Sequence, residues 1–313
     1  MTLESTRAPA LRNLRVLTLL LVPLALAYIV YASADHLGEL RAVRVSPIGV
    51  AGFVLLGTLS IALSTLYHAR LVAELANHRG SRQKTALAYA IGQIVRYLPG
   101  KVLGLVFQAS YLRGQIPAAS ITLAMLAQMA LAYFCAGMVA AVILGVHALG
   151  AYWPCALLAP AAALVWCANR HAWVETTLQR VPYVGRRMLG VALQPRSMRS
   201  ATALTLLLLL NWLPFLAGWA WLLRSSHSLG EALVFAAAYL AASIASTAMI
   251  VVPSGLVVRE AIFIWIGAQA GLPTSELLLY SVLARLALTA ADLLNAVLFW
   301  ALDRYRVRRE RIA

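Results

Sequence analysis

The stretch VVPSGLVVREA, residues 251–261, joins two long apolar runs and contains a proline, a glycine and an adjacent cation–anion pair. Pro253 lacks a backbone donor and clashes with the preceding turn, so a helix that reaches it should end there. Gly255 lets the chain turn, and a new helix can begin directly afterwards. Arg259 and Glu260 then fall in the first turns of that helix, inside an apolar region. Charges at such a depth are costly and favour a functional site, although an Arg–Glu pair can also simply neutralise itself.

An earlier segment has the same pattern. Residues 86–97 are apolar apart from two polar side chains, the sequence PGK at 99–101 interrupts them, and apolar sequence resumes over 102–112. Each arm has about a dozen residues, or roughly 18 Å of helix, against the roughly 30 Å of a bilayer's hydrocarbon core. The pattern predicts a re-entrant helical hairpin. In the later segment the first arm, 233–252, is long enough to cross, so a fully spanning hairpin stays open there.

A glycine followed by a proline comes after each of the two interruptions. Gly114 and Pro117 follow the first, Gly271 and Pro273 follow the second, and a long apolar helix comes next in both cases. Paired interrupted helices in the two halves of a membrane protein point to a transporter site.

The high content of hydrophobic residues indicates a membrane protein. Hydrophobic residues make up 62% of the 313 residues and charged residues 12%, and the mean hydropathy is +0.80. These values predict an all-α polytopic membrane protein and exclude an ordinary soluble domain. The net charge of +15 does not require a nucleic-acid partner, because the basic residues lie in short loops between apolar runs.

Those loops set the expected topology. We expect about six full spans and two hairpins; the spans cover roughly residues 14–34, 47–67, 118–146, 155–168, 201–223 and 277–302. Under this topology 19 loop cations lie on one side and three on the other. The bias places both termini in the cytoplasm of a bacterial inner membrane protein, with a basic cytoplasmic segment over 169–200. The N-terminal residues resemble a signal peptide, but their apolar run is long, so a retained first span is expected.

This orientation makes the two halves mirror each other. The first hairpin opens to the cytoplasm and the second to the outside. We therefore expect a single integral membrane domain over residues 1–313, with inverted-topology repeats at about 47–146 and 201–302. Secondary transporters with such repeats bind substrate between the two broken elements near the bilayer midplane.

Four cationic residues lie outside the loops: Arg96, Lys101, Arg259 and Arg285. The acidic residues in the same apolar segments are Glu260 and Asp292. A surplus of positive charge inside the membrane suits an anionic ligand such as a lipid phosphate. The alternative for Arg285 is an interfacial residue whose head group snorkels to water. The predicted substrate-binding set is Arg96, Pro99, Gly100, Lys101, Pro253, Ser254, Gly255, Arg259, Glu260, Arg285 and Asp292.

On one helix, Ser281, Arg285, Thr289 and Asp292 form a narrow polar stripe. Arg285 and Asp292 are about two turns apart, too far for a direct pair.

Signatures of catalysis are missing from the sequence. It has no metalloprotease, nucleophile-elbow or P-loop motif, and no carboxylate pair on a common helix. Five of the six histidines are expected in loops or at the ends of spans, and the sixth, His147, near an edge. We therefore expect no catalytic residues, metal or cofactor, and rank an intramembrane lipid-modifying enzyme well behind a transporter.

Three segments of the chain carry a family resemblance. RYLPGKV at 96–102, PSGLVVRE at 253–260 and Arg285 in the following helix resemble, in this order, the lysylphosphatidylglycerol synthase transmembrane-region family. The resemblance covers roughly residues 47–300. The family includes the flippase half of multiple-peptide-resistance factors and stand-alone relatives. The resemblance implies movement of an anionic or polyprenyl-linked lipid between leaflets. Val257 replaces the second glycine of the family's usual pattern, and lysyl-lipid synthesis is not implied.

The expected function is therefore a lipid flippase or transporter for an anionic or polyprenyl-phosphate-linked lipid, glycosylated or not. Its expected partner is a membrane lipid with a phosphate headgroup. The alternative is a non-transporting membrane subunit that positions a glycosyltransferase or lipid synthase.

Overall fold

The computed structural model describes residues 45–77, 80–95, 103–171, 196–248 and 258–312. Within these ranges the chain consists of helices joined by short turns, and none of the described residues forms a strand. The helices are α3 (Pro47–Leu75), α4 (Arg82–Val95), α5 (Leu103–Tyr111), α6 (Ala118–Leu149), the 3₁₀ helix η2 (Trp153–Leu157), α7 (Leu158–His171), α10 (Met198–Leu210), α11 (Trp212–Leu223), α12 (Leu229–Ala248), α13 (Val258–Gln269) and α14 (Thr274–Ile312).

Five of the described helical stretches are long and apolar enough to cross a membrane. They are α3, α6, the α10–α11 stretch Met198–Leu223, α12 over Leu229–Thr247, and α14 over Thr274–Arg309. The prediction of an all-helical chain with several membrane-length helices is confirmed. The predicted span over 155–168 is not among the five, because α7 has only 14 residues. The first predicted span, 14–34, lies outside the described residues, so the count of six stays a prediction.

Proline, glycine and small polar residues set the helix ends. Ser46 caps α3 by accepting a hydrogen bond from the Gly49 backbone N–H at 3.3 Å, and Pro47 occupies the first turn. At the other end of the chain, Gly271 has a φ of +80°, a left-handed conformation that glycine adopts without strain. It ends the turn after α13, and Pro273 then precedes α14. These signals could be read from the sequence because they act over only a few residues.

One predicted boundary is wrong. The second span was expected to end near Tyr67, but α3 continues to Leu75, because the polar side chains of its last turns find partners inside the protein. His68 contacts Gln128 at 2.7 Å, and Glu74 accepts a hydrogen bond from Ser200 at 2.7 Å.

The predicted span 201–223 corresponds to the membrane-length stretch Met198–Leu223, in which Asn211 separates α10 from α11. Pro214 explains this break, since a proline removes one backbone hydrogen bond and crowds the carbonyl four residues earlier.

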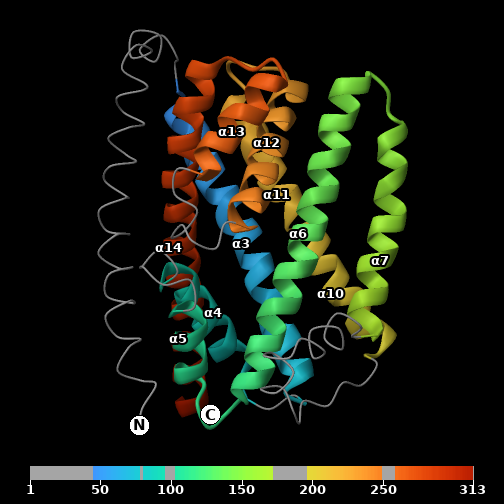
Figure 1. The fold of residues 1–313 in the computed structure, drawn as a ribbon. Helices are drawn as coiled ribbons and strands as arrows, with labels where there is room; N and C mark the ends of the chain where they lie inside the picture. Colours follow the sequence, from blue (N-terminus) through green and yellow to red (C-terminus); the bar gives the residue numbers. More distant parts are fainter. Residues whose placement is uncertain (1–44, 78–79, 96–102, 172–195, 249–257, 313) are drawn as a thin grey trace, which may run out of the picture.

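Two helix pairs lie at opposite ends of the molecule (Figure 1). The α4–α5 pair lies at the end where α14 finishes, and the α12–α13 pair lies at the end where α14 begins. Helix α3 runs between them and packs against α11, α14 and α4.

The core around α12 and α13 is aromatic. Trp219 of α11 lies 5.3 to 6.2 Å, between ring centroids, from Phe53, Phe235, Tyr239 and Phe263, and its side chain is fully buried. Such rings bury a large apolar area and hold the helices in a fixed arrangement. The α12–α13 pair is therefore anchored to α11 and α3 on the side of the polar site described next.

Candidate functional site

Three charged residues meet where α13 begins and α14 passes it. Arg259 and Glu260 lie in the first turn of α13, and Arg285 lies on α14, eleven residues after its start at Thr274. Eleven residues of helix rise about 16 Å, roughly half the thickness of the hydrocarbon core. A carboxylate in the first turn of a helix is also favoured by the helix dipole. The site thus lies deep along the membrane-length helix α14.

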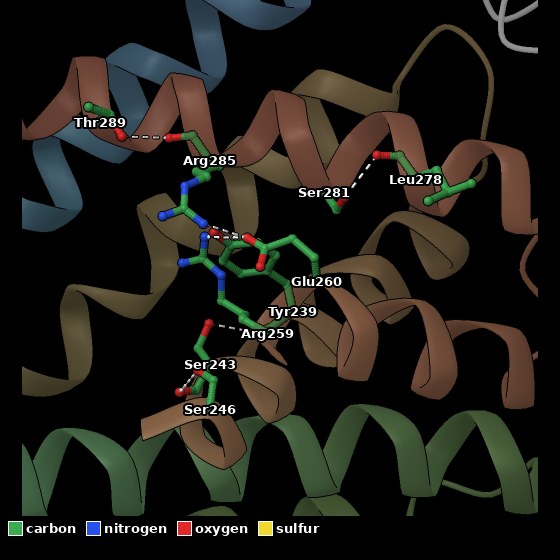
Figure 2. Close-up of polar contacts among 9 residues, drawn as sticks. All are labelled: Tyr239, Ser243, Ser246, Arg259, Glu260, Leu278, Ser281, Arg285 and Thr289. Carbon is green, nitrogen blue, oxygen red and sulfur yellow. Dashed lines mark hydrogen bonds and ion pairs between the residues drawn. The ribbon is translucent and has the colours of Figure 1, made fainter. Parts of the chain in front are cut away.

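One oxygen of Glu260 holds both arginines (Figure 2). Oε1 accepts a hydrogen bond from Nη2 of Arg259 at 3.0 Å and another from Nη1 of Arg285 at 2.9 Å. The Glu260 side chain is 7% exposed, whereas those of Arg259 and Arg285 are 20% and 22% exposed. The carboxylate is therefore enclosed, and each cation keeps part of its surface accessible.

Tyr239 of α12 supplies a third element to the site. The guanidinium carbon of Arg259 lies 5.0 Å from the centroid of the Tyr239 ring, a distance at which a cation is attracted by the ring face. Figure 2 shows the ring beside the two guanidinium groups. Tyr239 is not in the predicted substrate-binding set, and its only signal in the sequence is an aromatic side chain in the apolar run before Pro253.

The formal charges of Arg259, Glu260 and Arg285 do not cancel. Within this group of three described residues, two arginines share one carboxylate, which leaves one formal positive charge. Arg285 donates one hydrogen bond, to Glu260, although a guanidinium carries five N–H donors. Oε2 of Glu260 has no hydrogen-bond partner among the described residues. Because an unbalanced charge in a low-dielectric region is costly, the cluster is suited to bind an anion through the accessible face of Arg285.

The rest of the predicted polar stripe on α14 has other roles. Ser281 donates to the Leu278 carbonyl at 2.8 Å, and Thr289 donates to the Arg285 carbonyl at 2.9 Å. Asp292 is buried two turns after Arg285, and Arg285 pairs with Glu260 instead. The structure therefore brings together Arg259, Glu260 and Arg285 but does not pair Asp292 with Arg285.

The other predicted site residues lie outside the described residues: Arg96, Pro99, Gly100, Lys101, Pro253, Ser254 and Gly255. The expected meeting of the two hairpin tips, and the approach of Lys101 or Arg96 from the opposite face, stay predictions. In the described ranges, no three His, Cys, Asp or Glu side chains cluster in a way that could hold a metal ion.

Comparison of the chain with protein-family models, curated proteins and solved structures returns no match. The resemblance to the lysylphosphatidylglycerol synthase transmembrane-region family therefore stays a prediction that rests on the motifs in the sequence.

Proposed function

We propose that this chain is a lipid flippase or transporter of the bacterial inner membrane that binds the phosphate of an anionic or polyprenyl-linked lipid at Arg285. The carrying observation is the shared carboxylate: Glu260 fixes two arginines through one oxygen and leaves accessible donors on Arg285. A guanidinium held in this way presents a rigid fork to a phosphate, which two parallel hydrogen bonds can recognise.

The arrangement of the helices supports movement of the bound lipid. The α4–α5 and α12–α13 pairs lie at opposite ends of the molecule (Figure 1), as expected for inverted hairpins that enter the membrane from its two sides. In this proposal the hairpins alternate in opening, and the phosphate stays on the arginine while the acyl or prenyl chains remain in lipid.

Transport of a fluorescent lipid phosphate tests this function. Purified protein is reconstituted into liposomes, and the leaflet distribution of fluorescent phosphatidylglycerol and of a labelled polyprenyl phosphate is followed by dithionite quenching. We expect accelerated exchange of at least one of them, and no acceleration of a neutral lipid such as labelled diacylglycerol. If none of a broad panel of lipid phosphates moves faster than in protein-free liposomes, the proposal is wrong. A stably copurifying glycosyltransferase or synthase would then favour a positioning subunit.

A further inference from the structure

One exposed side of α14 is apolar along most of the helix and becomes cationic at its end. We call this side the outer face of α14. Its residues are exposed, and at 3.6 residues per turn they lie within an arc of about 80°: Leu286, Leu293, Val297, Trp300, Arg304 and Arg308. The apolar residues and the two arginines therefore form one continuous strip.

The apolar part of this strip is nearly as long as the hydrocarbon core of a bilayer is thick. Helix α14 is one of the stretches that could cross a membrane, and Val282 on the same side is exposed as well. From Val282 to Trp300 the helix rises about 27 Å, against roughly 30 Å of hydrocarbon. Trp300 then lies at the boundary between hydrocarbon and headgroups, where tryptophan is enriched.

The two arginines of the outer face lie at the level of the headgroups. Arg304 is about 6 Å and Arg308 about 12 Å beyond Trp300 along the helix. Side chains on a helix lean toward its N-terminus, so both guanidinium groups lean back toward the membrane. The guanidinium carbon of Arg304 lies 5.6 Å from the centroid of the Trp300 ring, which holds this cation beside the boundary.

Neither arginine has a counter-charge in the part of the chain that the structure describes. The described side chains over residues 301–309 include one carboxylate, Asp303, and it pairs with Arg306 at 3.1 Å. Arg304 and Arg308 form no ion pair with any described residue. Their charges are therefore available to an anion from outside this part of the chain.

The arginines border a hollow of about 460 Å³, a volume typical of small-molecule sites. Its described wall belongs to α14 alone and consists of Trp300, Ala301, Arg304, Tyr305, Val307 and Arg308. The hollow therefore combines aromatic surface with two cations, and its described wall contains no carboxylate.

We propose that the outer face of α14 binds a phospholipid with a negatively charged headgroup. The acyl chains lie along the apolar residues up to Trp300, and the phosphate lies in the hollow, where Arg304 and Arg308 donate hydrogen bonds to its oxygens. The lipid belongs to the leaflet at the α4–α5 end of the molecule, which is cytoplasmic in the expected topology. The site is about 28 Å along α14 from Arg285, and it does not rest on the transport function proposed above.

Charge favours a lipid over a protein segment as the occupant. In the sequence, the residues before the first predicted span include Arg7 and Arg12 and a single acid, Glu4. Packing of this segment, or of the outer face of a second copy, against the hollow would bring cations together, which is unfavourable. A phospholipid offers the opposite charge to the arginines and hydrocarbon to the apolar residues.

Photo-crosslinking from within the hollow identifies the occupant. Ala301 is replaced by p-benzoylphenylalanine, and the full chain is irradiated in nanodiscs that contain equal amounts of phosphatidylglycerol and phosphatidylcholine. Intact-protein mass spectrometry should show phosphatidylglycerol adducts about fivefold or more in excess. Equal capture of the two lipids, a crosslink within the chain or a crosslinked dimer would each overturn the proposal. Tyr305, which is also exposed, is a second position for the probe.

Neighbouring arginines provide a matched control. Arg304→Gln and Arg308→Gln should each lower the excess of phosphatidylglycerol at least about twofold. Arg309→Gln removes the same charge from an exposed position on the opposite side of the helix from Trp300 and should leave the excess unchanged. An equal loss in all three variants would mean a general effect of surface charge and would overturn the site. Arg285→Ala should keep the excess, so this test and the transport assay can fail separately.

Discussion

Glu260 determines how both arginines of the site are held. Its carboxylate is enclosed, and the only partners of its bonded oxygen among the described residues come from the adjacent residue and from a helix 25 residues away. Arg259 is held in addition by the ring of Tyr239, whereas Arg285 keeps donors that face outward. At this scale, Glu260 is a positioning residue and Arg285 is the group that would touch a ligand.

Replacing Glu260 by Gln should destabilise the protein by about 2 kcal/mol or more, because Arg285 then loses the carboxylate with which it pairs in a low-dielectric region. Thermal unfolding in nanodiscs measures the loss. The double variant Glu260→Gln with Arg285→Gln is the control, since it removes one of the two cations. We expect it to lose less than the sum of the two single variants; additive losses would mean that the pair is not coupled.

Replacing Arg285 by Ala should weaken binding of a lipid phosphate about 30-fold, the equivalent of about 2 kcal/mol for a lost charge-assisted hydrogen bond. Arg285→Lys should also bind less well, since lysine offers a point charge instead of a fork. Native mass spectrometry with phosphatidylglycerol in mixed micelles measures both. Arg224→Ala is the matched control, because Arg224 is exposed and lies over Trp221, 4.0 Å from its ring centroid. Unchanged binding by Arg285→Ala would remove this residue from the proposed site.

At the scale of elements, glycines allow a close approach between α4 and α5 and between α13 and α14. Gly104 of α5 lies against Gly92 of α4, where a Cβ on Gly104 would be 2.5 Å from the Gly92 carbonyl oxygen. In the other half, Gly267 of α13 faces the side chain of Leu277 on α14. Gly104 and Gly267 belong to the Gly-x-x-x-Gly spacings 100–104 and 267–271, and a small residue at such a position permits close helix contact. Gly271 instead forms the turn, and Gly100 lies outside the described residues.

Gly104→Ala should therefore destabilise the α4–α5 pair although alanine is the better helix former. The added methyl group meets backbone, which cannot move aside as a side chain can, and overpacking of this kind costs about 1–3 kcal/mol. Gly137→Ala on α6 is the matched control, because its Cβ would meet only Cδ1 of Ile244, at 3.7 Å. That variant should be neutral or slightly more stable. Melting temperatures in nanodiscs compare the two; equal effects would contradict the close packing.

At the scale of the whole molecule, the turn between α11 and α12 and the turn between α5 and α6 lie at opposite ends (Figure 1). His227 of the first turn pairs with Glu276 of α14 at 2.7 Å, which fastens that end of the α12 region to the start of α14. Arg113 follows α5 at the other end. If the long helices cross the membrane, the two turns face different compartments.

Cysteine labelling should show this difference. In a background in which Cys135, Cys155 and Cys167 are replaced by Ala, Ser226→Cys should react with a membrane-impermeant maleimide added to spheroplasts. Arg113→Cys should react only after lysis, since the loop cations place its side in the cytoplasm. Labelling of both positions from the same side would contradict the inverted arrangement, and the reverse pattern would contradict the orientation.

The sequence by itself determined the membrane class, most helix starts and the charged residues of the site. Apolar composition, the glycine and proline before a helix start and the rarity of charged residues in apolar runs are local properties of the sequence. Only the tertiary structure decided the contacts between helices. That one oxygen of Glu260 would hold both arginines depends on how α13 packs against α14, which no local pattern encodes.

The burial of His68 is a second feature that only the tertiary structure decided. Its position at the predicted end of a span indicated a loop residue, yet α3 continues past it and the ring is fully buried. Its partners come from helices 21 to 60 residues further along the chain. Helix propensity and hydropathy describe each segment alone, whereas the burial of a polar side chain depends on whether a distant segment supplies a partner. For His68, the packing of α4 and α6 against α3 decided this.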